Sequence, residues 1–160
     1  MTTANSGCEP EILAEAGRLS SIRIVVVDDF EGWRRSLITI LEKEPEFEVV
    51  YEAADGLEAV RVCEELRPDV VVLDIGLPKL SGFEAAQQIR DVSPDTKILF
   101  VSMIHSQEMV REALRIGAVG YVAKVNAMRD LLPAVKAAVA DEEFLSIRIL
   151  PDSWTDIPEE

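Results

Sequence analysis

The chain has 160 residues, 48% of them hydrophobic, which suits one compact domain with a full core and excludes a disordered chain. Thirty acidic residues against sixteen basic ones give a net charge of −14, which opposes direct nucleic-acid binding because that needs a basic face. Two cysteines are too few for a disulfide framework, and no signal peptide or membrane-spanning apolar run is present. We therefore expect a cytoplasmic protein without a membrane partner.

Strand and helix patterns alternate five times along the chain. Short runs rich in β-branched residues predict strands near residues 22–28, 47–53, 69–74, 97–102 and 120–123. Apolar residues at spacings of three and four predict helices near residues 31–43, 56–66, 81–91, 106–117 and 126–140. A repeated βα pattern indicates the α/β class, with a doubly wound parallel sheet and right-handed crossovers.

Acidic residues follow two of the apolar runs. Asp28 and Asp29 come directly after the first run, and Asp74 follows the third. The carboxyl ends of parallel strands line the ligand crevice of an open α/β sheet. If the two strands are neighbours, three negative charges crowd one crevice, which is unfavourable unless a cation lies there. Oxygen-only ligands point to Mg²⁺ or a similar hard ion.

Two further strand ends carry a hydroxyl and an ammonium. The fourth run ends at Ser102, and the fifth ends just before Lys124. A metal ion, a hydroxyl donor and a fixed cation are what a phosphoryl group requires, because its equatorial oxygens must be neutralised from several sides. One carboxylate would then accept that group covalently.

The set of residues resembles a known family, the receiver domain of bacterial two-component response regulators. The resemblance rests on these positions in order: Asp28-Asp29, Asp74 followed by Pro78 and Gly82, Ser102, and Gly120-Tyr121 with Lys124. The stretches EVVYEAADGLEAV, RPDVVVLDIGLPKLSGFEAA and MVREALRIGAVGYVAK are most similar to receivers of the LuxR-type (NarL/FixJ-like) subfamily. This resemblance covers about residues 22–140 and implies a flavodoxin-like (βα)5 fold with strand order 2-1-3-4-5.

The resemblance also implies a role for each acid. Asp74 is the expected phosphoacceptor, which takes the group from a sensor histidine kinase. Direct ligands of Mg²⁺ are expected to be Asp29, Asp74 and the backbone carbonyl of Gly76, while Asp28 holds the ion mainly through water. The chain would be a signalling switch rather than an enzyme, catalysing only its own phosphorylation and dephosphorylation.

Lys124 and Ser102 are expected to bind the phosphoryl oxygens. Ser102 and Tyr121 are the expected switch residues, which alter the surface formed by the fourth helix, fifth strand and fifth helix. Two copies of the chain could pair through that surface. In receivers the positions of Gly76 and Ile104 lie near the phosphoryl group, and neither side chain can orient an attacking water, so we expect slow hydrolysis of the phosphorylated form.

The extent of the resemblance divides the chain into three expected parts. Residues 1–20 form an N-terminal extension with a short amphipathic helix expected at 10–19, residues 21–141 form the receiver domain, and residues 142–160 form a C-terminal tail. The tail is too apolar to be simply a floppy end, so we expect it to pack on the body or on a partner. About 20 residues are too few for an independent domain, so no DNA-binding output domain is expected.

Each site residue also has an ordinary structural interpretation. Asp28 and Asp29 could cap a helix or lie in a solvated turn. Ser102 could cap the next helix, and Lys124 could be a solvated surface lysine. Five such residues at successive strand ends favour the functional interpretation.

Two other functions compete with the signalling switch. A small-molecule phosphatase with an aspartyl-phosphate intermediate would have a second acid two residues after the nucleophile, where this chain has Gly76. A flavin-binding electron carrier is disfavoured because the acidic loop after the first strand would repel a flavin phosphate.

Overall fold

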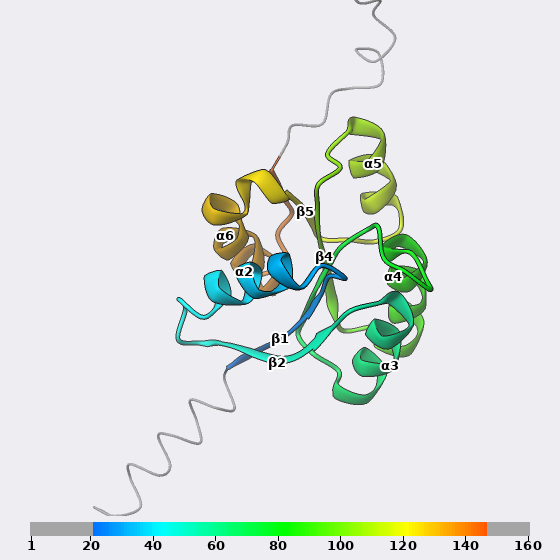
Figure 1. The fold of residues 1–160 in the computed structure, drawn as a ribbon, viewed down its shortest axis with the longest axis horizontal. Coiled ribbons are helices and arrows are strands. Elements are labelled where there is room, and N and C mark those ends of the chain that lie inside the picture. The colour runs from blue at the N-terminus through cyan, green and yellow to red at the C-terminus, as the bar shows by residue number, and fades with distance from the viewer. Residues whose placement is uncertain (1–20, 147–160) are drawn as a thin grey trace, which may run out of the picture.

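A computed structural model describes residues 21–146. Its centre is a six-stranded parallel sheet with the order β2-β1-β3-β4-β5-β6 (Figure 1). The strands are β1 (Ile22–Val27), β2 (Phe47–Ala53), β3 (Val70–Leu73), β4 (Lys97–Ser102), β5 (Gly120–Ala123) and β6 (Phe144–Leu145). The predicted order of the first five strands is confirmed, and β1 and β3 are neighbours.

Helices cover both faces of the sheet. They are α2 (Glu31–Leu41), α3 (Gly56–Leu66), α4 (Gly82–Val92), α5 (Gln107–Arg115) and α6 (Ala127–Val139). Helices α2 and α6 lie on one side, and α3, α4 and α5 lie on the other (Figure 1). The two sides form separate apolar clusters, because successive strand residues point to opposite faces. The predicted doubly wound fold is therefore confirmed.

The central strands show why their sequence reads as continuous apolar runs. In β1, Val25 packs in the cluster under α3, α4 and α5, whereas Ile24 and Val26 pack in the cluster under α2 and α6. All three side chains are fully buried. A strand covered on both faces has no solvent side, so the usual alternation of apolar and polar residues disappears.

The sixth strand was not predicted. It lies within the segment expected to be a tail and pairs with the outer edge of β5 in the register Gly120↔Phe144 and Tyr121↔Leu145. Two residues are too short to show any periodicity, so local pattern could not reveal this strand. The helix expected at residues 10–19 and the tail beyond residue 146 lie outside the described residues.

Candidate functional site

Three carboxylates meet at the carboxyl end of the sheet. Strands β1 and β3 pair in the register Val27↔Leu73, so the residues that follow them are side by side. Carboxylate oxygens of Asp28, Asp29 and Asp74 all lie within 4.8 Å of one another. Asp28 and Asp74 are buried, while Asp29 is exposed. The structure thus brings together the three acids that the sequence predicted as a cluster.

Backbone contacts hold Asp28 in place. Its Oδ1 accepts a hydrogen bond from the Phe30 amide at 2.9 Å, and its carbonyl accepts one from Nη1 of Arg34 at 2.8 Å. Its Oδ2 is buried and accepts no hydrogen bond of good geometry from the described residues, although the ammonium of Lys124 lies 2.6 Å away. The buried carboxylate of Asp28 is therefore paired with a cation, as a buried charge requires.

Asp74 lies beside the same ammonium. Its Oδ2 lies 3.2 Å from Nζ of Lys124, and its Oδ1 accepts a hydrogen bond from the Ile75 amide at 2.8 Å. Burial raises the pKa of Asp74, and the negative charge of Asp28 adds to that increase, while Lys124 opposes it. The carboxylate form therefore depends on nearby positive charge.

Close packing at Gly82 completes the loop after β3. A Cβ atom at Gly82 would lie 2.0 Å from the carbonyl oxygen of Asp74, so only glycine lets α4 begin against the strand end. Gly76, whose carbonyl we predicted to be a metal ligand, is exposed and has no heavy atom within 4 Å of its Cβ position. A side chain at Gly76 would therefore meet open space.

Lys124 is the residue that joins the acids. It follows β5 directly, is only 4% exposed, and reaches across to Asp28 and Asp74. Its Nζ also lies over the indole ring of Trp33, 5.1 Å from the ring centroid. A solvated surface lysine, the ordinary interpretation of this residue, is wrong for this structure.

Ser102 and Tyr121 both contact the loop between β4 and α5. The Oγ atom of Ser102 accepts a hydrogen bond from the Ile104 amide at 3.1 Å, and the hydroxyl of Tyr121 donates to the Ile104 carbonyl. The ring of Tyr121 is fully buried, and burial raises the pKa of its hydroxyl to about 12. The two predicted switch residues thus contact the same loop residue: Ser102 binds the amide of Ile104, and Tyr121 binds its carbonyl.

Two contacts near the acids were not predicted from the sequence. Arg34 donates to the carbonyl of Asp28 and forms an ion pair with Glu52 at 2.9 Å, and Trp33 covers Lys124. Both belong to the start of α2, four to six residues after the acid pair. A helix that starts at a site returns its early residues toward it, and that spacing was the available signal.

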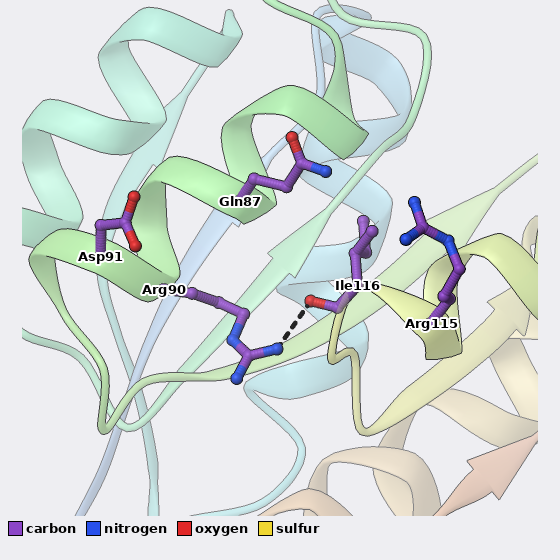
Figure 2. A pocket seen from close by; sticks show the side chains of 5 residues that line it. All are labelled: Gln87, Arg90, Asp91, Arg115 and Ile116. Atoms are coloured by element: carbon purple, nitrogen blue, oxygen red, sulfur yellow. Dashed lines mark hydrogen bonds between the residues drawn. The ribbon is translucent and has the colours of Figure 1, made fainter.

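A separate pocket of about 380 Å³ lies between α4 and α5 (Figure 2). It is lined by Gln87, Arg90, Asp91, Arg115 and Ile116. Gln87 lies in the middle of α4, and the other four residues lie in the last turns of α4 and α5 or directly follow α5. Crossover helices run opposite to the strands, so their last turns lie near the amino ends of the strands. The pocket is therefore displaced away from the acids, which lie at the carboxyl ends. Its arginines already have partners: Arg90 donates to the Ile116 carbonyl at 2.9 Å, and Arg115 pairs with Glu112.

Within residues 21–146, no helix is long and apolar enough to cross a membrane.

The parallel sheet, the acid cluster and the buried lysine define a receiver of the two-component type. Comparison with known families agrees: the response regulator receiver domain matches residues 24–136, and the chain belongs to this family. The predicted family membership is confirmed.

Similar proteins include regulators longer than this chain. The transcriptional regulatory protein DegU of Brevibacillus brevis is 35% identical over 130 residues, which cover 81% of this chain and 55% of DegU. LiaR of Bacillus subtilis (strain 168) is 34% identical over 128 residues, or 80% of this chain and 61% of LiaR. The chain therefore spans little more than half the length of these relatives.

Other relatives match over nearly their full length. Chemotaxis protein CheY of Listeria monocytogenes is 37% identical over 117 residues, which cover 73% of this chain and 98% of that protein. A LuxR-family two-component response regulator from Aurantimonas sp. SI85-9A1 has a solved structure with a TM-score of 0.76 and 36% identity, covering 79% of this chain and 91% of that one. The LuxR-family structure agrees with the predicted LuxR-type subfamily.

Proposed function

We propose that this chain is a phosphoacceptor switch of a two-component phosphorelay, in which Asp74 takes a phosphoryl group from a sensor histidine kinase. The observation that carries the proposal is the position of Lys124, whose buried ammonium lies 2.6 Å from Asp28 and 3.2 Å from Asp74. A fixed cation beside a carboxylate cluster suits a transferring phosphoryl group, because its oxygens need neutralisation from several sides.

Mg²⁺ is the metal ion that this donor set fits. Asp28, Asp29, Asp74 and the carbonyl of Gly76 would hold it, and all of these donors are oxygens. When bound, the ion neutralises negative charge on the acids and on the phosphoryl group. The convergence of one carboxylate oxygen from each of the three acids within 4.8 Å supports this assignment.

Asp74 is the proposed nucleophile. One of its oxygens attacks phosphorus, the bond from phosphorus to the imidazole nitrogen of the kinase breaks, and the imidazole leaves with that electron pair. The attack requires the ionised carboxylate, whose pKa is raised by burial. Positive charge from Lys124 therefore acts twice, since it favours the carboxylate before the attack and the phosphoryl oxygens afterwards.

Ser102 and Tyr121 are the proposed switch. A phosphoryl oxygen on Asp74 would accept a hydrogen bond from Ser102, whose Oγ now accepts from the Ile104 amide. The loop between β4 and α5, which contains Ile104, would then move toward the site. This movement would break the hydrogen bond from Tyr121 to the Ile104 carbonyl. The changed surface would lie over α5, β5 and α6, where a partner or a second copy could bind in the cytoplasm.

The test is phosphorylation by a small donor. The native chain, incubated with Mg²⁺ and acetyl phosphate, should gain one phosphoryl group by intact mass, and Asp74→Asn should gain none. Asp95→Asn, which changes an exposed loop acid, is the matched control and should behave as the native chain. A phosphoryl group on Asp74→Asn, or none on the native chain with either acetyl phosphate or a phosphorylated histidine kinase, would refute the proposal. Continuous release of phosphate from small phosphoesters would indicate a phosphatase instead.

A further inference from the structure

The ammonium of Lys124 has a neighbour that the proposed function does not use. Its Nζ lies over the indole ring of Trp33, 5.1 Å from the ring centroid, and the lysine is almost fully buried. A cation over the face of tryptophan is attracted by the electron density of the ring, and the attraction is strongest where water is excluded. Lys124 is therefore held by an aromatic ring as well as by two carboxylates.

The start of α2 fixes the ring relative to the acids. Trp33 lies in the first turn of α2, five residues after Asp28, and its side chain is half-buried. Arg34, the next residue, donates to the Asp28 carbonyl at 2.8 Å. Asp28 and the indole ring are thus held together by the start of α2. Lys124 instead follows β5, which is separated from β1 by β3 and β4.

The two carboxylates do not hold the ammonium equally. Its distance is 2.6 Å to Asp28 but 3.2 Å to Asp74, the proposed phosphoacceptor. A lysine has a long flexible stem, so its ammonium can follow the nearer carboxylate. An attraction to a ring face depends little on which oxygen the ammonium also contacts, so it persists while the ammonium shifts from one oxygen to another.

We propose that Trp33 is a positioning residue for phosphoryl transfer, whose ring holds the Lys124 ammonium within reach of Asp74. This inference rests on the proposed function. The ring restrains the ammonium at the acid cluster, 3.2 Å from Asp74, so that it can meet the phosphoryl oxygens on Asp74. A weaker ring face should slow phosphorylation without changing the metal ligands.

The experiment changes the electron density of the ring and almost nothing of its shape. The sequence has two tryptophans, Trp33 and Trp154, so a Trp154→Phe chain can be labelled at Trp33 alone with fluorinated tryptophans. Initial rates of phosphorylation by acetyl phosphate, at saturating Mg²⁺, should fall stepwise from tryptophan through monofluoro- to trifluorotryptophan. We expect a total decrease of about tenfold.

A second readout does not depend on activity. Urea unfolding of the same series should show decreasing stability with each added fluorine in chains that carry Lys124, and no trend in chains with Lys124→Met. A ring that only fills space would give a flat series in both backgrounds, because its shape is nearly constant. Flat rates in a chain that does accept a phosphoryl group would overturn the role of Trp33. A lack of phosphorylation in the unlabelled chain would instead count against the proposed function.

Discussion

Lys124 and Asp28 form a buried ion pair with Nζ 2.6 Å from Oδ2, although two strands, β3 and β4, separate β5 from β1 in the sheet. The contact lies at the carboxyl ends of the strands, and Asp74, which follows β3, lies beside the same ammonium. One lysine thus offsets much of the charge that the fold concentrates there.

Removal of this lysine should destabilise the chain. We expect Lys124→Met to lose about 3 kcal/mol of free energy of unfolding, because two buried carboxylates are left without their cation. Urea unfolding in the presence of a chelator measures the loss, and Mg²⁺ should restore part of it. Lys79→Met, which removes an exposed ion pair with Asp55, should cost less than about 0.5 kcal/mol. Equal losses for the two variants would contradict this account.

Asp74 should make the chain less stable as the pH rises. Its pKa in the folded chain is raised by burial, so between the unfolded and folded pKa values the folded state binds more protons. Stability therefore falls with increasing pH across that window and stays lower above it. Without metal, Asp74→Asn should unfold at a higher urea concentration than the native chain at pH 7. The advantage should vanish below about pH 4, near the unfolded pKa, and an advantage that persisted there would exclude ionisation as its cause.

A side chain at Gly117 should destabilise the chain. Its φ is +103°, and a Cβ would lie 1.8 Å from Nη1 of Arg90, the atom that donates to the Ile116 carbonyl (Figure 2). Gly117→Ala combines backbone strain with loss of that hydrogen bond and should cost about 3 kcal/mol in urea unfolding.

The matched control is Gly76→Ala, because Gly76 lacks both the positive φ and the close neighbour. It should cost less than about 1 kcal/mol. In an Arg90→Met background the cost of Gly117→Ala should shrink, since part of the clash is gone. An undiminished cost would assign the whole effect to the backbone.

The phosphorylated form should persist because the site lacks a side chain that positions water. Gly76 offers none, and Ile104, which is partly exposed beside Ser102, is apolar. The double change Gly76→Asn with Ile104→Glu should shorten the lifetime of the phosphoryl group by about tenfold or more. Intact mass after removal of acetyl phosphate follows the decay. Gly76→Asn with Met103→Glu places the same charge one residue away and should leave the lifetime nearly unchanged; a similar shortening would indicate a general effect of charge.

The sequence predicted the five main strands and helices because their patterns are local. Buried strands such as β1 and β3 are short β-branched runs. The acids that follow them correctly indicated that the site lies at the carboxyl ends of these strands. Helix ends were less accurate: α5 ends at Arg115 rather than at 117, since Gly117 takes a positive φ just beyond it. Local pattern can place a boundary only approximately, because tertiary contacts such as that of Arg90 decide the last turn.

The contacts that complete the site were beyond prediction. Chemistry indicated that a lysine should lie near Asp74, but the closer contact of Lys124 is with Asp28. The difference depends on side-chain reach across two strands, which no sequence spacing encodes. The spacing of Trp33 from the acid pair could place it near the acids, but it could not show that its ring lies over Lys124, because those two residues are far apart in the chain.

The short strand β6 leaves the sheet with a protected edge. It covers β5 yet contributes only two residues, Phe144 and Leu145, within the described part of the chain. So brief an edge offers little backbone for another strand, a known device against edge-to-edge aggregation. Within residues 21–146, this side of the sheet therefore offers a second copy of the chain little backbone for strand pairing.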